Sequence, residues 1–287
     1  MITFGERMES AKEYIEELLK FTLQSHVNET LGFDLCLSKE FCSNLLQDDP
    51  DDSFSLPLTP DSSSNCDPFD GVPRYPLFKR LASAIYHSIV SGALCRTYDK
   101  AEFSSEDGCL KQKEEEWEKS ILEKGTQIMD ILKSVSHELH VQEPFFSLLK
   151  DGVKTIDGRC AGGIHDRMKP GFVILLNKSV VLEVEAIHHY VSFSKMLEAE
   201  GLGKVLPGVE TIEEGVKIYR SFYTEERERS NGVLAILVLK LAAQPYLVLA
   251  SLLSELSYSG LQSLLGLGHT AGSVSGALPP PRSKAVP

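Results

Sequence analysis

The densest group of residues that could carry chemistry lies just beyond residue 150. Lys154, Asp157 and Arg159 follow one another within six residues, behind a short helix expected to end at Gly152. A lysine in a cleft can act as a base or nucleophile only if burial or a nearby cation lowers its pKa, whereas a neighbouring carboxylate keeps it charged. Arginine presents a planar fork of donors that suits a phosphate or the edge of a base. The group predicts a polar binding site, with an exposed ladder of ion pairs as the alternative.

The backbone of this segment is expected to be the edge of a strand. In an extended chain Lys154 points to one side, while Thr155, Asp157 and Arg159 point to the other. A bend at Gly158 would relax this alternation. The sequence therefore places the lysine and the aspartate on opposite faces unless the chain bends.

No metal or cofactor site is expected elsewhere. His137 and His140 are only three residues apart and lack the i, i+4 spacing of zinc-binding helices, and the adjacent His188 and His189 point to opposite faces of a strand. The run 201–204 lacks the spacing of a phosphate-binding loop. The six cysteines form no C-x-x-C pair.

A second group mixes aromatic and basic residues near residue 220. Aromatic rings beside arginines can stack on single-stranded bases. Glutamates interleave with them, so ordinary packing on a helix face is the favoured interpretation. The residues are Tyr219, Phe222 and Tyr223, with Arg220, Arg227 and Arg229 and with Glu225, Glu226 and Glu228.

The elements before residue 140 are predicted to be helical. Apolar residues recur at spacings of three and four over residues 8–22, 77–93 and 117–139, and a shorter helix is expected at 39–46. The acidic segment 48–73, rich in proline and serine, cannot bury enough apolar area to offset its ordering entropy, so a mobile loop is expected there.

The periodicity changes near residue 150. Strands are predicted at 172–176, 180–187 and 232–241, with helices at 194–200 and 211–223, where Thr211 and Glu214 have the capping-box spacing. This pattern is typical of a small α+β domain or a partly open barrel.

A nearly continuous apolar run covers residues 233–253. Lys240, Gln244 and Pro245 lie near its middle, where a charge is costly in a membrane and a proline breaks a helix. A buried strand followed by a buried helix is therefore predicted in place of a membrane span. We expect this last helix to share a core with the two long N-terminal helices, packed against one side of the barrel.

The run from Gly152 to Arg159 resembles the G-x-K-x-x-E-x-R signature of the ASCH (ASC-1 homology) domain family, with Asp157 in place of the usual glutamate. The resemblance extends over roughly residues 144–240 and includes Pro170-Gly171 before a strand and the run 206–209 before a helix. It implies an α+β fold, a PUA-like small β-barrel flanked by N- and C-terminal helices, as in the longer plant ASCH-domain proteins. The implied organisation is N-terminal helices at 1–47, the acidic loop at 48–73, two long helices at 74–140, the ASCH domain at 141–243, and an apolar helix with a disordered tail at 244–287.

The resemblance also implies a function. ASCH domains are regarded as RNA-binding or coactivator-linked modules with a cleft beside the signature, which by position gives Lys154, Thr155, Asp157 and Arg159 as residues binding RNA or a modified nucleoside. Small bacterial members are amidohydrolases acting on N4-acetylcytidine with a lysine, a hydroxyl residue and a glutamate. On that alternative Lys154 and Glu200 would be catalytic, although the hydroxyl position falls on Asp157. A further departure is Phe172, where the family has an aspartate.

The charge distribution limits the partners. The net charge is −12, which argues against a general nucleic-acid coat, but residues 1–143 hold 14 basic and 27 acidic side chains while residues 144–240 hold 13 of each. A locally basic site is therefore compatible with RNA or a nucleoside as the ligand. The acidic N-terminal half could bind a protein partner, which gives a third hypothesis, an interaction scaffold. With no apolar leader and scattered cysteines, we expect a cytoplasmic or nuclear protein.

Overall fold

The structure is a computed structural model that describes residues 4–47, 76–95, 108–163 and 165–266. These residues fall into two compact units, one within Met1–Ile131 and Pro245–Pro287 and the other within Leu132–Gln244. The predicted acidic loop at 48–73 and the predicted disordered tail beyond 266 lie outside the described residues.

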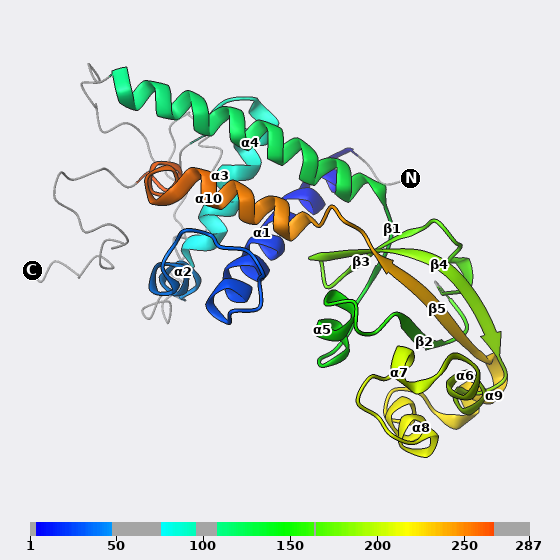
Figure 1. Ribbon diagram of the computed structural model, residues 1–287. Helices are drawn as coiled ribbons and strands as arrows, with labels where there is room; N and C mark the ends of the chain where they lie inside the picture. The colour runs from blue at the N-terminus through cyan, green and yellow to red at the C-terminus, as the bar shows by residue number, and fades with distance from the viewer. Residues whose placement is uncertain (1–3, 48–75, 96–107, 164, 267–287) are drawn as a thin grey trace, which may run out of the picture. The chain divides into compact units, whose positions relative to one another are not determined.

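The first unit is built from helices (Figure 1). Helix α2 has the predicted bounds, and Ser38 caps it by accepting a hydrogen bond from the Phe41 N–H. Helix α10 bends at Ser257, whose φ of 54° is not helical. The helices are α1 (Phe4–Val27), α2 (Lys39–Leu46), α3 (Leu77–Ser91), α4 (Gly108–Ser134) and α10 (Pro245–Leu264).

Helix α10 shares a core with the N-terminal helices, as expected from its apolar sequence. It contacts α1 and α3. Leu249, Leu253 and Leu256 on α10 are fully buried. On its α4 side, Glu255 forms an ion pair with Lys124 at 3.1 Å.

The predicted helix over 117–139 is too long. Helix α4 ends at Ser134, and Val135–Leu139 is strand β1, which pairs in parallel with β3 (Val173–Leu176). Apolar residues at 128, 132, 135 and 139 fit a helical stripe, but Val135 and Leu139 also fit the alternating burial of a strand. Pairing with β3 decides between the two, and a single sequence does not show such a long-range contact.

The second unit contains a mixed five-stranded sheet with the order β1-β3-β4-β5-β2. Strands β4 (Val180–Tyr190), β5 (Val233–Lys240) and β2 (Ile156–Cys160) are joined to their neighbours by antiparallel pairing. β1 and β2 are the edges, so these strands form an open mixed sheet, which agrees with the predicted α+β domain and does not show closure into the small barrel that the resemblance implied. Between the two edges, Arg159 Nη2 donates to the His140 carbonyl oxygen at 3.4 Å.

Short helices gather at one end of this sheet, beside β2 (Figure 1). The predicted cap is confirmed, because the Thr211 side chain accepts a hydrogen bond from the Glu214 N–H. Phe193 stacks on Tyr219 with ring centroids 4.2 Å apart, which joins two of the helices in one core. The helices are α5 (Phe145–Lys150), α6 (Phe193–Glu200), α7 (Leu202–Val205), α8 (Ile212–Arg220) and α9 (Glu225–Asn231), with a 3₁₀ turn η1 at His165–Arg167.

The apolar run at 233–253 divides as predicted into strand β5 and the first half of α10. Among the helices of the described ranges, none is long and apolar enough to cross a membrane.

Candidate functional site

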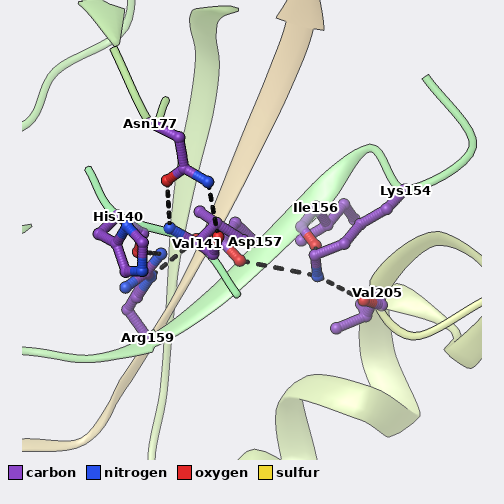
Figure 2. Close-up of polar contacts among 8 residues, drawn as sticks. All are labelled: His140, Val141, Lys154, Ile156, Asp157, Arg159, Asn177 and Val205. Carbon is purple, nitrogen blue, oxygen red and sulfur yellow. Dashed lines mark hydrogen bonds and ion pairs between the residues drawn. The ribbon is translucent and has the colours of Figure 1, made fainter. Parts of the chain in front are cut away.

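Lys154 and Asp157 lie close together at the start of β2, although strict alternation predicted opposite faces. Because β2 begins at Ile156, Lys154 precedes the strand and its side chain turns back (Figure 2). The buried ammonium donates to the carbonyl oxygens of Ile156 at 2.7 Å and Val205 at 2.5 Å, and lies 3.7 Å from Asp157 Oδ1. Burial lowers the pKa of Lys154 to about 8, and the Asp157 charge opposes this shift.

Asp157 is held ionised between two cations. Its Oδ2 accepts a hydrogen bond from Arg159 Nε at 2.7 Å. Burial alone would raise the pKa of the Asp157 carboxyl, but the charges of Arg159 and Lys154 together hold it below its usual value. The same ion pair raises the pKa of Arg159. At neutral pH the three side chains therefore carry two positive charges and one negative charge.

Asn177 fixes the chain that faces Arg159. Its side-chain Oδ1 accepts from the Val141 N–H at 2.9 Å, and its Nδ2 donates to the Val141 carbonyl at 2.8 Å (Figure 2). Its own N–H donates to the Leu139 carbonyl at 3.0 Å. These bonds continue the β1–β3 ladder past the end of both strands, so that the His140 carbonyl can accept from Arg159.

A cavity of about 200 Å³ opens over this cluster. Its walls combine aromatic rings from α8 and the turn after it with the charged groups of β2. The Tyr219 hydroxyl oxygen is buried and lies beside the Gly158 main chain. The lining residues are His140, Val141, Gln142, Phe145, Lys154, Asp157, Gly158, Arg159, Leu206, Ile218, Tyr219, Phe222 and Tyr223.

Gly158 makes room for the aromatic wall. A Cβ at this position would lie 2.7 Å from Met196 Cε and still closer to the Tyr219 hydroxyl oxygen. The register pairs Gly158 with Ala235, while the Val238 N–H donates to the Thr155 carbonyl. Because hydrogen-bonded and non-hydrogen-bonded pairs alternate in an antiparallel ladder, the Gly158 amide points away from β5. The main chain of Gly158 therefore faces away from β5, toward the Tyr219 hydroxyl.

Two of the predicted site residues do not line the cavity. Thr155 is exposed, and its backbone N–H donates to the Lys204 carbonyl. Glu200 accepts hydrogen bonds from His188 Nδ1 at 2.6 Å and the Tyr190 hydroxyl at 2.7 Å. Burial would raise the pKa of Glu200, but these two hydrogen bonds and the nearby cations lower it.

The aromatic wall was the less favoured interpretation of the sequence. Tyr219, Phe222 and Tyr223 do line the cavity, whereas Arg220 forms ion pairs with glutamates of α9. Phe145 was missed altogether, since an aromatic residue in a short helix carries no local sign of a binding site. Phe172, the second departure from the family pattern, stacks on His137 at 5.5 Å and is not among the lining residues.

No metal centre is found in the part of the chain that the structure describes. Within the described ranges, no three His, Cys, Asp or Glu side chains lie close enough together to hold a metal ion.

The sequence pattern of the ASCH domain family matches residues 139–242. A hypothetical protein of solved structure, PH0355, is 44% identical, with a TM-score of 0.36 and a match that covers 37% of this chain and 98% of that one. Protein PF0455 from Pyrococcus furiosus is 45% identical, with a TM-score of 0.34 and coverage of 37% and 97%. No curated protein matches the chain. Residues 139–242 therefore form a domain of the ASCH family, whose fold is PUA-like, which confirms the resemblance carried by the Gly152–Arg159 signature.

Proposed function

We propose that this protein binds RNA or a modified nucleoside by holding a single base in the cavity over β2. The observation that carries the proposal is the composition of the walls, in which three aromatic rings of residues 219–223 face a buried ion cluster. The cavity, at about 200 Å³, is smaller than the roughly 300–1,000 Å³ typical of drug-sized ligands, which favours one planar base over a larger molecule.

Each wall has a defined part in this proposal. Aromatic faces stack on any base, and hydrogen bonds then select its edge. The Tyr219 hydroxyl, which lies beside the Gly158 main chain, has a hydrogen to donate to a buried edge. Arg159 presents its guanidinium donors beside them, held in place by Asp157. Lys154 is a positioning residue, because its ammonium already donates to two carbonyl oxygens and supports Asp157.

The test is equilibrium binding of the full-length protein to single-stranded RNA pools and to free nucleosides at low salt. Arg159→Ala is expected to weaken binding at least tenfold, because a charged donor to the ligand contributes about 1.5–3 kcal/mol. Lys195→Ala is the matched control, since this exposed lysine pairs only with Glu198 on its own helix. Absence of binding to every RNA pool and nucleoside would overturn the proposal.

An amidohydrolase acting on N4-acetylcytidine-like nucleosides is the second candidate, and one observation favours it. Burial lowers the pKa of Lys154 to about 8, which is the direction a catalytic base requires. Glu200, the other residue of that hypothesis, pairs with His188 and Tyr190 and does not line the cavity, so the enzyme would depend on Lys154. Hydrolysis of N4-acetylcytidine that is lost in Lys154→Met would establish the enzyme, and inactivity of the wild type would exclude it for this substrate.

A coactivator role, a protein partner of the acidic N-terminal half and a cytoplasmic or nuclear location remain predictions from the sequence. An interaction experiment that compares the full chain with one carrying charge-neutralising substitutions on α1 tests the scaffold hypothesis. Unchanged partners would contradict it.

A further inference from the structure

An arginine with no ion-pair partner among the described residues lies over Tyr223, which lines the cavity. The guanidinium of Arg227, on α9, is 5.5 Å from the ring centroid of Tyr223, which is a lining residue. The other two arginines of this region are paired, Arg220 with Glu225 and Glu228, and Arg229 with Glu225 at 2.8 Å. Arg227 thus combines an exposed charge with a position fixed by stacking, as arginines that recognise phosphate do.

The neighbouring charges are also unbalanced. Lys154 and Arg159 share a single carboxylate, that of Asp157, among the residues described here. Tyr223 interacts with both arginines, because burial raises the pKa of its hydroxyl while the Arg159 charge opposes this rise, and the Arg227 guanidinium lies over its ring. The charges of Lys154, Arg159 and Arg227 therefore exceed that of Asp157, and an anionic group on the ligand would reduce this excess.

His165, in the 3₁₀ turn after β2, adds a titratable group to the same side. Its Nδ1 is buried and has no hydrogen-bond partner among the described residues. The charged groups that act on it are Asp157 and Arg159 of β2, Arg227 of α9 and Asp166 of its own turn. Burial and then the two arginines lower the pKa of His165, so the ring is neutral at pH 7 and an anion placed beside it would favour its protonated form.

We propose that Arg227, Arg159 and His165 form a phosphate subsite next to the base-binding cavity, so that the preferred ligand is a nucleotide or an RNA phosphodiester and not a free nucleoside. This inference rests on the proposed function, since it assumes that a base occupies the cavity. It adds the position of the ligand's phosphate, on the Tyr223 side, and a dependence on pH.

The experiment uses calorimetry or fluorescence titration of the full-length protein. Probes are the four ordinary ribonucleosides and N4-acetylcytidine, each with its 5′- and 3′-monophosphate, together with the corresponding dinucleoside monophosphates and inorganic phosphate. The 5′- or 3′-phosphate that reaches Arg227, Arg159 and His165 is expected to tighten binding about tenfold. This is the effect of one charge-assisted hydrogen bond. Comparing the monophosphates with the dinucleoside monophosphates shows whether the subsite prefers a terminal phosphate or a phosphodiester within an RNA chain.

Arg227→Gln is expected to remove this tenfold gain while leaving nucleoside affinity unchanged. Arg229→Gln is the matched control, because it removes an arginine from the same helix that is already paired with Glu225. With RNA oligonucleotides, Arg227→Gln should also reduce the slope of log affinity against log salt by about one unit.

The dependence of affinity on pH is measured with a dinucleoside monophosphate, because its single phosphodiester keeps its charge between pH 5 and 8. Affinity of the wild type is expected to rise as the pH falls from 7.5 to 5.5, because protonated His165 is favoured by the phosphate. His165→Gln should flatten this profile and leave nucleoside affinity unchanged.

The outcomes separate the two proposals. If no nucleoside or nucleotide binds, the base-binding function itself is wrong. If nucleosides bind but a phosphate adds nothing, or if Arg227→Gln and Arg229→Gln weaken nucleotide binding equally, the subsite is wrong and the base cavity stands.

Discussion

The side-chain amide of Asn177 pairs with the main chain of Val141, accepting its N–H at 2.9 Å and donating to its carbonyl at 2.8 Å. Asn177 has a φ of 45°, in the left-handed region that asparagine tolerates better than most residues. The amide thus acts as one more peptide group at the end of β3 and holds residues 140–142, which line the cavity, in place.

Asn177→Gly should loosen that wall. Glycine accepts the left-handed backbone, so the substitution removes the amide without adding strain. Loss of the two hydrogen bonds is expected to cost about 1–3 kcal/mol in the free energy of unfolding and to speed amide exchange at Val141. Hydrogen exchange measured by NMR checks this. Protection of Val141 equal to that of the wild type would contradict the positioning role.

Gly158→Ala should fill the cavity from its floor. The added methyl group would lie 2.7 Å from Met196 Cε, and the Tyr219 ring would have to move. Overpacking of this kind costs about 1–3 kcal/mol, and we expect base binding to be lost with it. Gly203→Ala is the matched control, because a Cβ there meets nothing within 4 Å. Equal binding by the two variants would show that the ligand does not enter this cavity.

Local signals in the sequence predicted α2 and the start of α8, whereas the helix expected at 211–223 ends at Arg220 and α9 was not predicted. The bounds of α2 and the Thr211 cap were correct because a cap and a few apolar residues determine them over one or two turns. Strand β1 was not predicted, since its apolar spacing continues that of α4 and only its pairing with β3 makes it a strand. The open edges of the sheet depend in the same way on pairings that one sequence does not reveal.

The sequence predicted the charged residues of the candidate site, but it did not predict which residues from other elements line the cavity. Lys154, Asp157 and Arg159 lie close in sequence, so their meeting required only the bend before β2. Asn177 and Val141 are 36 residues apart, and no periodicity links them. Glu200 was assigned by analogy of position, but the hydrogen bonds from His188 and Tyr190 hold its carboxylate elsewhere.

Asp157→Asn should make the free energy of unfolding of the second unit less dependent on pH in the acidic range. The pKa of Asp157 is lowered from its usual value of 3.8, so its ionised form stabilises the fold above that pH and the contribution is lost as the pH falls through the folded pKa. Removing the charge leaves the buried Lys154 and the partly buried Arg159 without the carboxylate that they share, which is expected to cost about 3–5 kcal/mol at pH 7.

Urea denaturation at pH 7 and pH 3, followed by near-UV circular dichroism, measures this difference. The difference in the free energy of unfolding between wild type and Asp157→Asn should shrink at pH 3, because the carboxyl of the unfolded wild-type chain is largely protonated below its usual pKa of 3.8 while the folded state resists protonation. Asp151→Asn is the control, since Asp151 is exposed on its turn and pairs with Lys150. If the difference in the free energy of unfolding between the two proteins did not change with pH, the Asp157 carboxylate would not be stabilised by its two cations.

Leu253→Ala should destabilise the helical unit through α10. Leu253 is fully buried on a helix that contacts both α1 and α3, so the substitution opens a cavity in their shared core. Such changes cost about 2–5 kcal/mol. The single tryptophan, Trp117 on α4, is 7% exposed and reports on the unfolding of this unit by fluorescence. Val90→Ala is the control within the same unit, because Val90 on α3 is 52% exposed and its truncation should change stability by less than about 0.5 kcal/mol. If the two variants unfolded at the same urea concentration, α10 would not be an integral part of the helical core.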